Sequence, residues 1–192
     1  MIEHKLPYES FIGGWFIDKN ICNDLVKFFN NLDSTYKGPG TINENVVDKD
    51  KKDSIDFAFK EEKHFKNFLP YRKELIKVLQ KYKLRYPECD SVQSYGMFEN
   101  TNIQYYKKGS GFKSWHNERA SGIHPVNRRH LVFMTYLNDV DNGGTEFKLQ
   151  NLIIPAVKGL TLIWPTDWTH THRGVISKTQ DKYIITGWFS YE

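Results

Sequence analysis

A run of short, strand-like segments from residue 92 to the end of the chain restricts the possible folds more than any other feature. These segments are rich in β-branched and aromatic residues and are separated by Gly, Asn and Asp turns: 102–107, 111–116, 130–137, 145–148, 151–154, 160–164, 171–176 and 182–190. Many short strands with regular turn signals predict an antiparallel sandwich or a jelly roll. We therefore expect an α+β fold with a jelly roll at its core.

Two amphipathic helices are predicted in the first 90 residues. In the first helix, which Asp18 or Asn20 can cap, the apolar residues Ile21, Leu25, Phe28, Phe29 and Leu32 recur at helical spacing. Pro70 is predicted to open the second helix, whose apolar side is formed by Tyr71, Leu75, Val78, Leu79 and Tyr82. Short strands are expected at 11–17 and 55–59. The expected layout is one domain of residues 1–192, with helical support over about 1–90 and a jelly-roll core over about 91–192.

Charge and composition exclude several classes of protein. The net charge is only +4, from 27 Lys and Arg against 23 Asp and Glu, so nucleic acid is not expected as a partner. The mean hydropathy is -0.61, and no run approaches the roughly 20 apolar residues of a membrane helix. Cys22 and Cys89 match no disulfide framework or metal-site spacing, which favours a reducing compartment. We expect a cytoplasmic protein with no membrane partner.

His116 and Glu118 are the first candidates for chemistry. Side chains alternate faces along an extended segment, so these two project to one side while Asn117 points away. Two histidines and one carboxylate form the facial triad of non-haem iron sites, and His172 or His170 would supply the second histidine. A His-x-Glu pair also occurs by chance, and a zinc hydrolase uses the same ligand types.

Lys182 follows His172 by ten positions. If these residues lie on two strands joined through the turn at 178–181, both side chains point into one cavity. A buried ammonium beside a metal is repelled unless an anion lies between them. A dicarboxylate that chelates the metal at one end and pairs with Lys182 at the other supplies that anion. An exposed lysine after a turn is the alternative.

Seven motifs in the C-terminal half carry a resemblance to a known family. They are Tyr106 with Gly109-Ser110-Gly111-Phe112, Trp115-His116-Asn117-Glu118, Tyr136-Leu137-Asn138-Asp139, Gly143-Gly144-Thr145-Glu146-Phe147, Lys158-Gly159 with Leu162-Ile163-Trp164-Pro165, His172-Arg173-Gly174-Val175, and Lys182-Tyr183-Ile184 with Trp188-Phe189. In order and spacing, residues 92–192 resemble the iron(II)- and 2-oxoglutarate-dependent oxygenases of the prolyl 4-hydroxylase-like type. That resemblance implies a double-stranded β-helix (a cupin-like jelly roll) with the N-terminal helices packed on one sheet.

The resemblance also implies the roles of individual residues. It makes His116, Glu118 and His172 the iron ligands, and it places Lys182 on the distal carboxylate of 2-oxoglutarate. The resemblance also implies that Tyr106, Tyr136 and Thr145 line the co-substrate pocket. For the two tyrosines, packing in the core is an equal alternative. Gly143-Gly144 is expected to form a tight turn, and Trp188 to pack beneath the site.

The implied reaction is hydroxylation of an unactivated C–H bond, with 2-oxoglutarate and O2 consumed and succinate and CO2 released. Fe(II) is the implied metal and ascorbate a further expected cofactor. The implied substrate is a prolyl residue of a peptide or protein. The alternative substrates are another amino-acid side chain, a small molecule or a nucleic acid. A further alternative is a non-catalytic, cupin-like metal-binding module. The oligomeric state is left open.

The sequence departs from the family at Glu118, since the usual carboxylate is aspartate. Similar bacterial and phage sequences use His-x-Glu. A phage origin would place the protein in the host cytoplasm. Two polar segments, 34–53 and 119–129, flank the predicted mouth and are expected to be lids over the substrate, although disorder is a comparable interpretation of 34–53.

Overall fold

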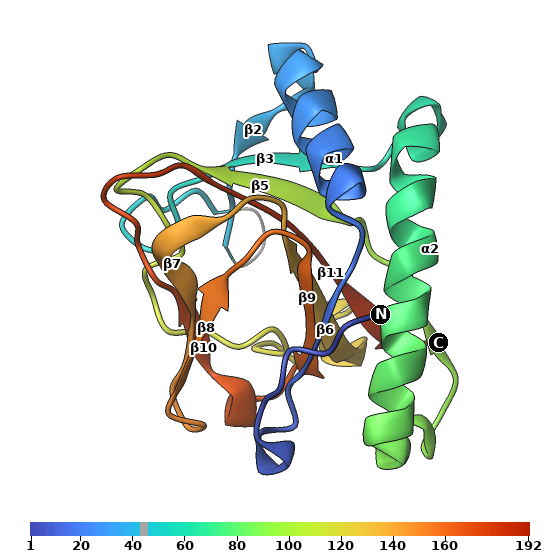
Figure 1. Cartoon of the computed structure of the whole chain (residues 1–192). Helices are drawn as coiled ribbons and strands as arrows, with labels where there is room; N and C mark the ends of the chain where they lie inside the picture. The colour runs from blue at the N-terminus through green and yellow to red at the C-terminus, as the bar shows by residue number, and fades with distance from the viewer. Residues whose placement is uncertain (43–45) are drawn as a thin grey trace.

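Two antiparallel sheets form the centre of the molecule, and two helices cover the outside of the larger one (Figure 1). The computed structural model describes residues 1–42 and 46–192. The helices are α1 (Lys19–Asn31) and α2 (Glu62–Arg85). The strands are β1 (Gly13–Phe16), β2 (Gly38–Pro39), β3 (Ile55–Ala58), β4 (Tyr95–Gly96), β5 (Asn102–Tyr106), β6 (Arg129–Tyr136), β7 (Val140–Phe147), β8 (Leu152–Ala156), β9 (Leu160–Pro165), β10 (His172–Gly174) and β11 (Lys182–Tyr191).

The larger sheet has the order β1-β9-β6-β11-β5-β3-β2, with β4 paired to β11, and the smaller sheet has the order β10-β7-β8. Within the described residues, these strands all pair antiparallel. The chain folds as an α+β protein with a double-stranded β-helix, as the strand-rich half predicts. The early strands β1 and β3 pair with β9 and β5, so the first 90 residues also contribute to the main sheet.

Strand β6 shows how one apolar run supports two cores. Alternate side chains of a strand face opposite sides of its sheet. Leu131 and Phe133 pack with the helices, whereas Val132, Met134 and Tyr136 face the space between the sheets. Burial on both faces accounts for the almost continuous apolar sequence of β6.

The two helices follow their predicted stripes. Asp18 caps α1, its carboxylate accepting a hydrogen bond from the Asn20 amide at 2.8 Å, and Leu25 and Phe29 are buried. Helix α2 begins at Glu62, so the prediction that Pro70 opens it is wrong. Phe68, two residues before that proline, packs on Phe59 and Tyr71 with ring centroids 5.1 and 5.9 Å away. Burial of this aromatic side chain offsets the backbone hydrogen bond that an internal proline removes.

Two other local predictions are wrong. Residues 111–116 form only isolated bridges, at Phe112 and His116, in place of the expected strand. Gly143 and Gly144 lie inside β7 rather than in a tight turn, and the register shifts between Val140 and Thr145. The second glycine permits a close approach of two backbones, because a Cβ atom there would lie 2.0 Å from the Ile154 carbonyl oxygen.

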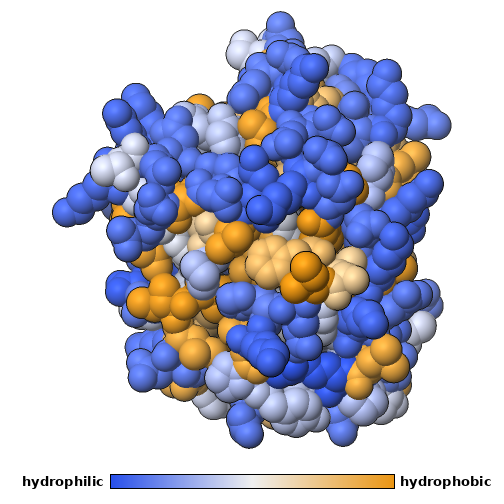
Figure 2. All heavy atoms as spheres, viewed as in Figure 1, coloured by the Kyte–Doolittle hydropathy of each residue, from blue (hydrophilic) through white to orange (hydrophobic). Residues whose placement is uncertain are grey.

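The outer surface matches the low mean hydropathy of the chain. On the face shown in Figure 2 most of the atoms are hydrophilic, and hydrophobic atoms gather in the middle of the face. Neither of the helices in the described ranges is long and apolar enough to cross a membrane. The assignment of residues 1–192 to one domain stays a prediction.

Candidate active site

Three predicted residues come together in one cavity. The cavity has a volume of about 1220 Å³, and His116, Glu118 and His172 are among its lining residues. Oε1 of Glu118 lies 3.5 Å from Nε2 of each histidine, and one ligand atom from each of the three residues lies within 4.8 Å of the others. Metal–ligand bonds of about 2.1 Å place neighbouring ligand atoms roughly 3 Å apart, so this cluster is of the right size for one ion.

Backbone hydrogen bonds bring these distant residues together. His116 and His172 form an isolated antiparallel bridge, with each amide donating to the other residue's carbonyl at 3.0 and 2.8 Å. The amide of Glu118 donates to the Thr166 carbonyl, which follows β9. The segment carrying His116 and Glu118 is therefore held against the ends of β9 and β10 by a few main-chain bonds.

The hydrogen bonds of the two histidines define their tautomers. Nδ1 of His116 lies 3.0 Å from the Ser114 carbonyl oxygen, and Nδ1 of His172 lies 2.8 Å from that of His170. A carbonyl only accepts, so each Nδ1 carries the proton and each Nε2 presents a lone pair. Burial and the neighbouring His172 also lower the pKa of His116, which favours the neutral ring. Two imidazole lone pairs and a carboxylate oxygen then face one point, the donor set that a divalent ion requires.

Residues beside the two histidines fix their positions. The ring of Phe112 stacks on His116 with centroids 3.5 Å apart and planes 7° apart.

His170, the alternative to His172, is buried with its Nε2 at 3.0 Å from the Ser10 carbonyl oxygen, and it is not part of the three-residue cluster. Its contacts are those of a structural residue.

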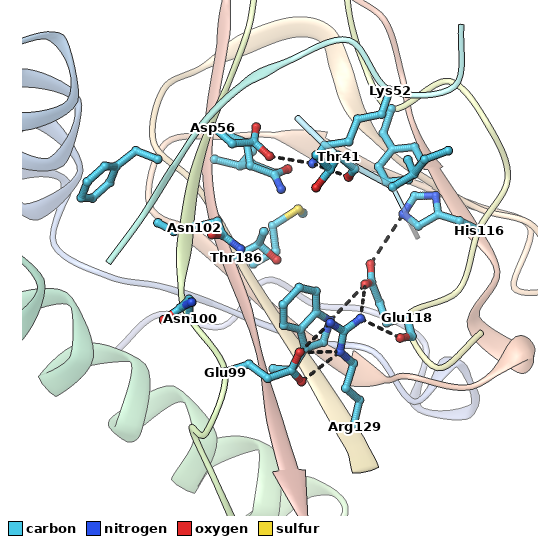
Figure 3. A pocket seen from close by; sticks show the side chains of 18 of the residues that line it. Thr41, Lys52, Asp56, Glu99, Asn100, Asn102, His116, Glu118, Arg129 and Thr186 are labelled. Atoms are coloured by element: carbon cyan, nitrogen blue, oxygen red, sulfur yellow. Dashed lines mark hydrogen bonds and ion pairs between the residues drawn. The ribbon is translucent and has the colours of Figure 1, made fainter. Parts of the chain in front are cut away.

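The carboxylate of Glu118 divides its two oxygens between the histidines and a second group of residues. Oε2 accepts a hydrogen bond from Trp188 Nε1 at 3.0 Å and lies 3.9 Å from Nη1 of Arg129 (Figure 3). Burial opposes ionisation of this carboxyl group, whereas the hydrogen bond from Trp188 and the nearby Arg129 cation favour the carboxylate. The carboxyl group is therefore ionised at neutral pH.

Lys182 reaches the same cavity from the other sheet. The expected hairpin between His172 and Lys182 is wrong, because β10 pairs with β7 in the small sheet whereas β11 belongs to the large one. The two side chains nevertheless line one cavity across the gap between the sheets. The Lys182 ammonium donates to the carbonyls of Gly143 at 2.8 Å and Val175 at 3.1 Å. One of its three N–H groups thus remains for a ligand.

The other predicted pocket residues also line this cavity. Tyr106 donates its hydroxyl proton to Gln104 at 2.7 Å, and its ring centroid lies 5.4 Å from the Lys182 Nζ. The hydroxyls of Tyr136 and Thr145 are 2.6 Å apart. Since one of these hydroxyls donates to the other, the pair keeps one free proton for an anion. Burial raises the pKa of Tyr136, so its hydroxyl remains protonated.

One of the two expected lids is firmly attached at its end. Residues 43–45 of the segment 34–53 lie outside the described residues. Close to its end, the Lys51 carbonyl accepts from the Lys113 amide at 2.7 Å, and Lys52 forms a buried ion pair with Asp56 at 2.7 Å. Figure 3 shows Lys52 above the cavity, near His116. The end of this segment therefore forms part of the cavity wall.

Sequence reasoning missed two residues of the site, Arg129 and Glu99. It also missed the hydrogen-bonding role of Trp188, which was expected only to pack beneath the site. A signal existed for Trp188, because Lys182, Ile184, Thr186 and Trp188 alternate along β11 and all line the cavity. No such signal marks Arg129. In β6, Leu131 pairs with Phe189 and Arg129 with Ser190, so a bulge at His130 turns Arg129 onto the cavity side.

A jelly roll with two histidines and a carboxylate converging in its cavity, and a buried lysine opposite them, defines the class of non-haem metal oxygenases. Comparison with known proteins agrees with this class. Residues 101–190 match the family model described as the 2OG-Fe(II) oxygenase superfamily. No curated protein matches the chain.

Solved structures of prolyl hydroxylases share the fold. The viral collagen prolyl hydroxylase of Paramecium bursaria Chlorella virus-1, solved with 2-oxoglutarate (2OG), has 16% identity and a TM-score of 0.66, covering 95% of this chain and 97% of its own. The Pseudomonas putida prolyl-4-hydroxylase has 14% identity and a TM-score of 0.68, covering 93% and 92%. The Trichoplax adhaerens prolyl hydroxylase, in complex with a peptide fragment of the hypoxia inducible factor, has 15% identity and a TM-score of 0.72, covering 95% and 84%.

The matched segment belongs to the 2OG-Fe(II) oxygenase superfamily. The protein is a 2-oxoglutarate-dependent dioxygenase with the fold of the prolyl 4-hydroxylases. The cofactors that its family implies are Fe(II) and 2-oxoglutarate.

Proposed function

We propose that His116, Glu118 and His172 bind Fe(II), that Lys182 binds the distal carboxylate of 2-oxoglutarate, and that the enzyme hydroxylates a prolyl residue of a peptide or protein. The observation that carries this proposal is the convergence of the three ligand atoms within 4.8 Å in the cavity that Lys182 also lines. The iron supplies oxygen activation coupled to decarboxylation of 2-oxoglutarate, with release of succinate and CO2.

The residues of the chain bind and orient the co-substrate. The free N–H of Lys182 and the free hydroxyl proton of the Tyr136–Thr145 pair both serve a carboxylate as hydrogen-bond donors. Tyr106 packs beside the ammonium and shields it from water. Ionised Glu118 and the two neutral histidines would hold the ion from one side and would leave positions on it for the co-substrate and oxygen. Buried aromatic rings, including Phe147 and Trp164 beside His172, keep bulk water away from this centre.

A peptide or protein substrate fits the size of the cavity. Small-molecule sites have volumes of roughly 300–1,000 Å³, and this cavity of about 1220 Å³ is larger. Its lining includes the apolar residues Phe98 and Ile123, which are 60% and 63% exposed, and the amide side chains of Asn100 and Asn102. Apolar side chains with nearby amides suit an extended peptide, whose backbone needs hydrogen-bond partners and whose prolyl ring needs an apolar contact.

The decisive experiment combines two measurements on purified protein. Fe(II), 2-oxoglutarate and a peptide library are supplied, succinate is quantified, and peptides are screened by mass spectrometry for the gain of one oxygen. His172→Ala is expected to abolish both signals, whereas His170→Gln, at the neighbouring structural histidine, should retain succinate formation. Oxidation confined to non-prolyl residues would refute the proposed substrate class, and undiminished succinate formation by His172→Ala would refute the ligand assignment.

Two finer parts of the proposal have their own tests. Ascorbate is expected to sustain turnover, which a comparison of succinate yields with and without it measures. Segments 34–53 and 119–129 are proposed as substrate lids, because residues from both line the cavity. A deletion within 38–50 is expected to raise the KM for substrate more than that for 2-oxoglutarate, and equal changes would refute the lid.

A further inference from the structure

We propose that Trp188 and Arg129 are positioning residues that hold Glu118 as a one-oxygen ligand, and that they adapt the site to a glutamate in place of the shorter aspartate. This inference rests on the proposed function, since it assigns a metal to Glu118. It concerns residues of this chain that never touch the metal themselves.

The two oxygens of Glu118 have separate partners. Oε1 lies 3.5 Å from Nε2 of both His116 and His172. Oε2 takes the hydrogen bond from Trp188 Nε1 at 3.0 Å and lies 3.9 Å from Arg129 Nη1. An indole N–H is a donor only, so it binds Oε2 in a fixed direction. Only Oε1 is left to face the metal.

Arg129 is itself held on several sides. Its guanidinium pairs with Glu99, with Nη2 at 2.6 Å from Oε2, and it lies 3.5 Å from the centroid of the Trp188 ring. Nη1 also donates to the backbone carbonyl of Glu118 at 3.0 Å, and Ser190 donates to Glu99 at 3.1 Å. Figure 3 shows Glu99, Arg129 and Glu118 in this sequence along one side of the cavity. The side chains of Arg129 and Glu99 are only 14% and 11% exposed, so water competes little for these contacts.

A glutamate ligand needs this support more than an aspartate does. Its extra methylene adds one rotatable bond, and holding that bond in one rotamer costs conformational entropy on binding. The longer side chain also allows both oxygens to reach the ion. Bidentate binding would occupy a position that the co-substrate or oxygen needs on the open side of the metal. The hydrogen bond from Trp188 to Oε2 opposes both effects. It fixes the Glu118 rotamer before the metal binds, and it keeps the second oxygen away from the metal.

The main test removes the indole N–H and keeps an aromatic ring. Binding of Co(II), as an oxygen-stable probe, is measured by calorimetry for the wild-type protein, for Trp188→Phe and for the control Trp168→Phe. Trp168 is 68% exposed and is not one of the residues that line the cavity. Loss of a group that orients a metal ligand weakens affinity about 10–100-fold, so that range is expected for Trp188→Phe and no change for the control. Equal affinity of Trp188→Phe and the control would overturn the inference.

A double-mutant cycle separates positioning from simple packing. In Glu118→Asp the shorter carboxylate no longer reaches both the metal and Trp188, so adding Trp188→Phe to this background is expected to have no further effect on Co(II) affinity. If Trp188→Phe weakens binding equally in both backgrounds, Trp188 acts independently of Glu118 and the inference is wrong. A metal-free readout completes the cycle: the indole N–H resonance of Trp188, identified by its loss in Trp188→Phe, should shift in Glu118→Asp.

The failures of the two proposals are distinguishable. If the wild-type protein binds no Co(II), or His172→Ala binds it equally well, the metal site itself is refuted. If wild type binds and His172→Ala does not, while Trp188→Phe binds as tightly as Trp168→Phe, only the positioning role is refuted. Circular dichroism establishes that each variant is folded. Arg129→Lys replaces Trp188→Phe should the latter not fold, with weaker Co(II) binding expected and unchanged binding overturning the inference.

Discussion

The affinity for 2-oxoglutarate should fall as the pH rises through the pKa of Lys182. Lys182 is only 6% exposed, and burial lowers the pKa of its ammonium group to about 8. With that pKa, about 90% of the free enzyme carries the charge at pH 7 and about 10% at pH 9. In the proposed role of Lys182, only the charged form pairs with the distal carboxylate, so the apparent Kd is expected to increase about tenfold, or about 1.4 kcal/mol, between these pH values.

The assay is anaerobic calorimetry of 2-oxoglutarate binding to the metal-loaded protein at several pH values. Near pH 9 most of the bound complexes must take up a proton, so the measured heat should depend on the ionisation enthalpy of the buffer. Lys182→Arg is the matched control, because its guanidinium stays charged throughout this range and its Kd should not change with pH. A wild-type profile as flat as that of Lys182→Arg would refute the reasoning, and a decline shared by both proteins would indicate a different titrating group.

Three further predictions concern stability and reactivity. Phe133→Ala, in the fully buried centre of β6, should lower the free energy of unfolding by about 3–5 kcal/mol in urea titrations. Thr135→Val should cost about 1–3 kcal/mol in the same assay, because the buried Tyr71 hydroxyl loses its partner at 3.0 Å; a cost no larger than that of an exposed substitution would contradict this. Burial raises the pKa of Cys22 to about 12, so mass spectrometry should detect its alkylation at pH 8 only after unfolding.

Much of the fold follows from local patterns in the chain. The stripe of α1, the cap at Asp18 and the strands near 102–107, 130–137, 160–164 and 182–190 agree with the structure. Burial of one face gives α1 its helical periodicity, and burial of both faces gives β6 and β9 their continuous apolar runs. Errors occur where tertiary contacts override a local signal. Helix α2 begins before Pro70, where Phe68 is buried, and the glycine pair lies within β7, where the backbone of Ile154 comes close to Gly144.

The site was predictable to the extent that it depends on alternation and spacing. His116 and Glu118 project to one side as expected, and the structure brings His172 and Lys182 to the same cavity. The path by which Lys182 arrives was not predictable, since strand pairing across two sheets leaves no local trace. Arg129 was hidden for a related reason: a bulge at His130 reverses the facing of the residue before it, and no local residue pattern marks that bulge.

The bridge between His116 and His172 has a further consequence for the dynamics of the protein. The segment between β5 and β6 is held mainly by isolated bonds rather than by a strand ladder, which is typical of regions that open locally while the rest stays folded. With the proposed ligand set, an ion bound by both histidines and Glu118 would tie this segment to β10 and would suppress that opening. Amide hydrogen exchange near residues 114–118 should therefore slow on metal loading, while exchange in the centre of β6 stays unchanged, so that metal loading sets the local order of the cavity wall.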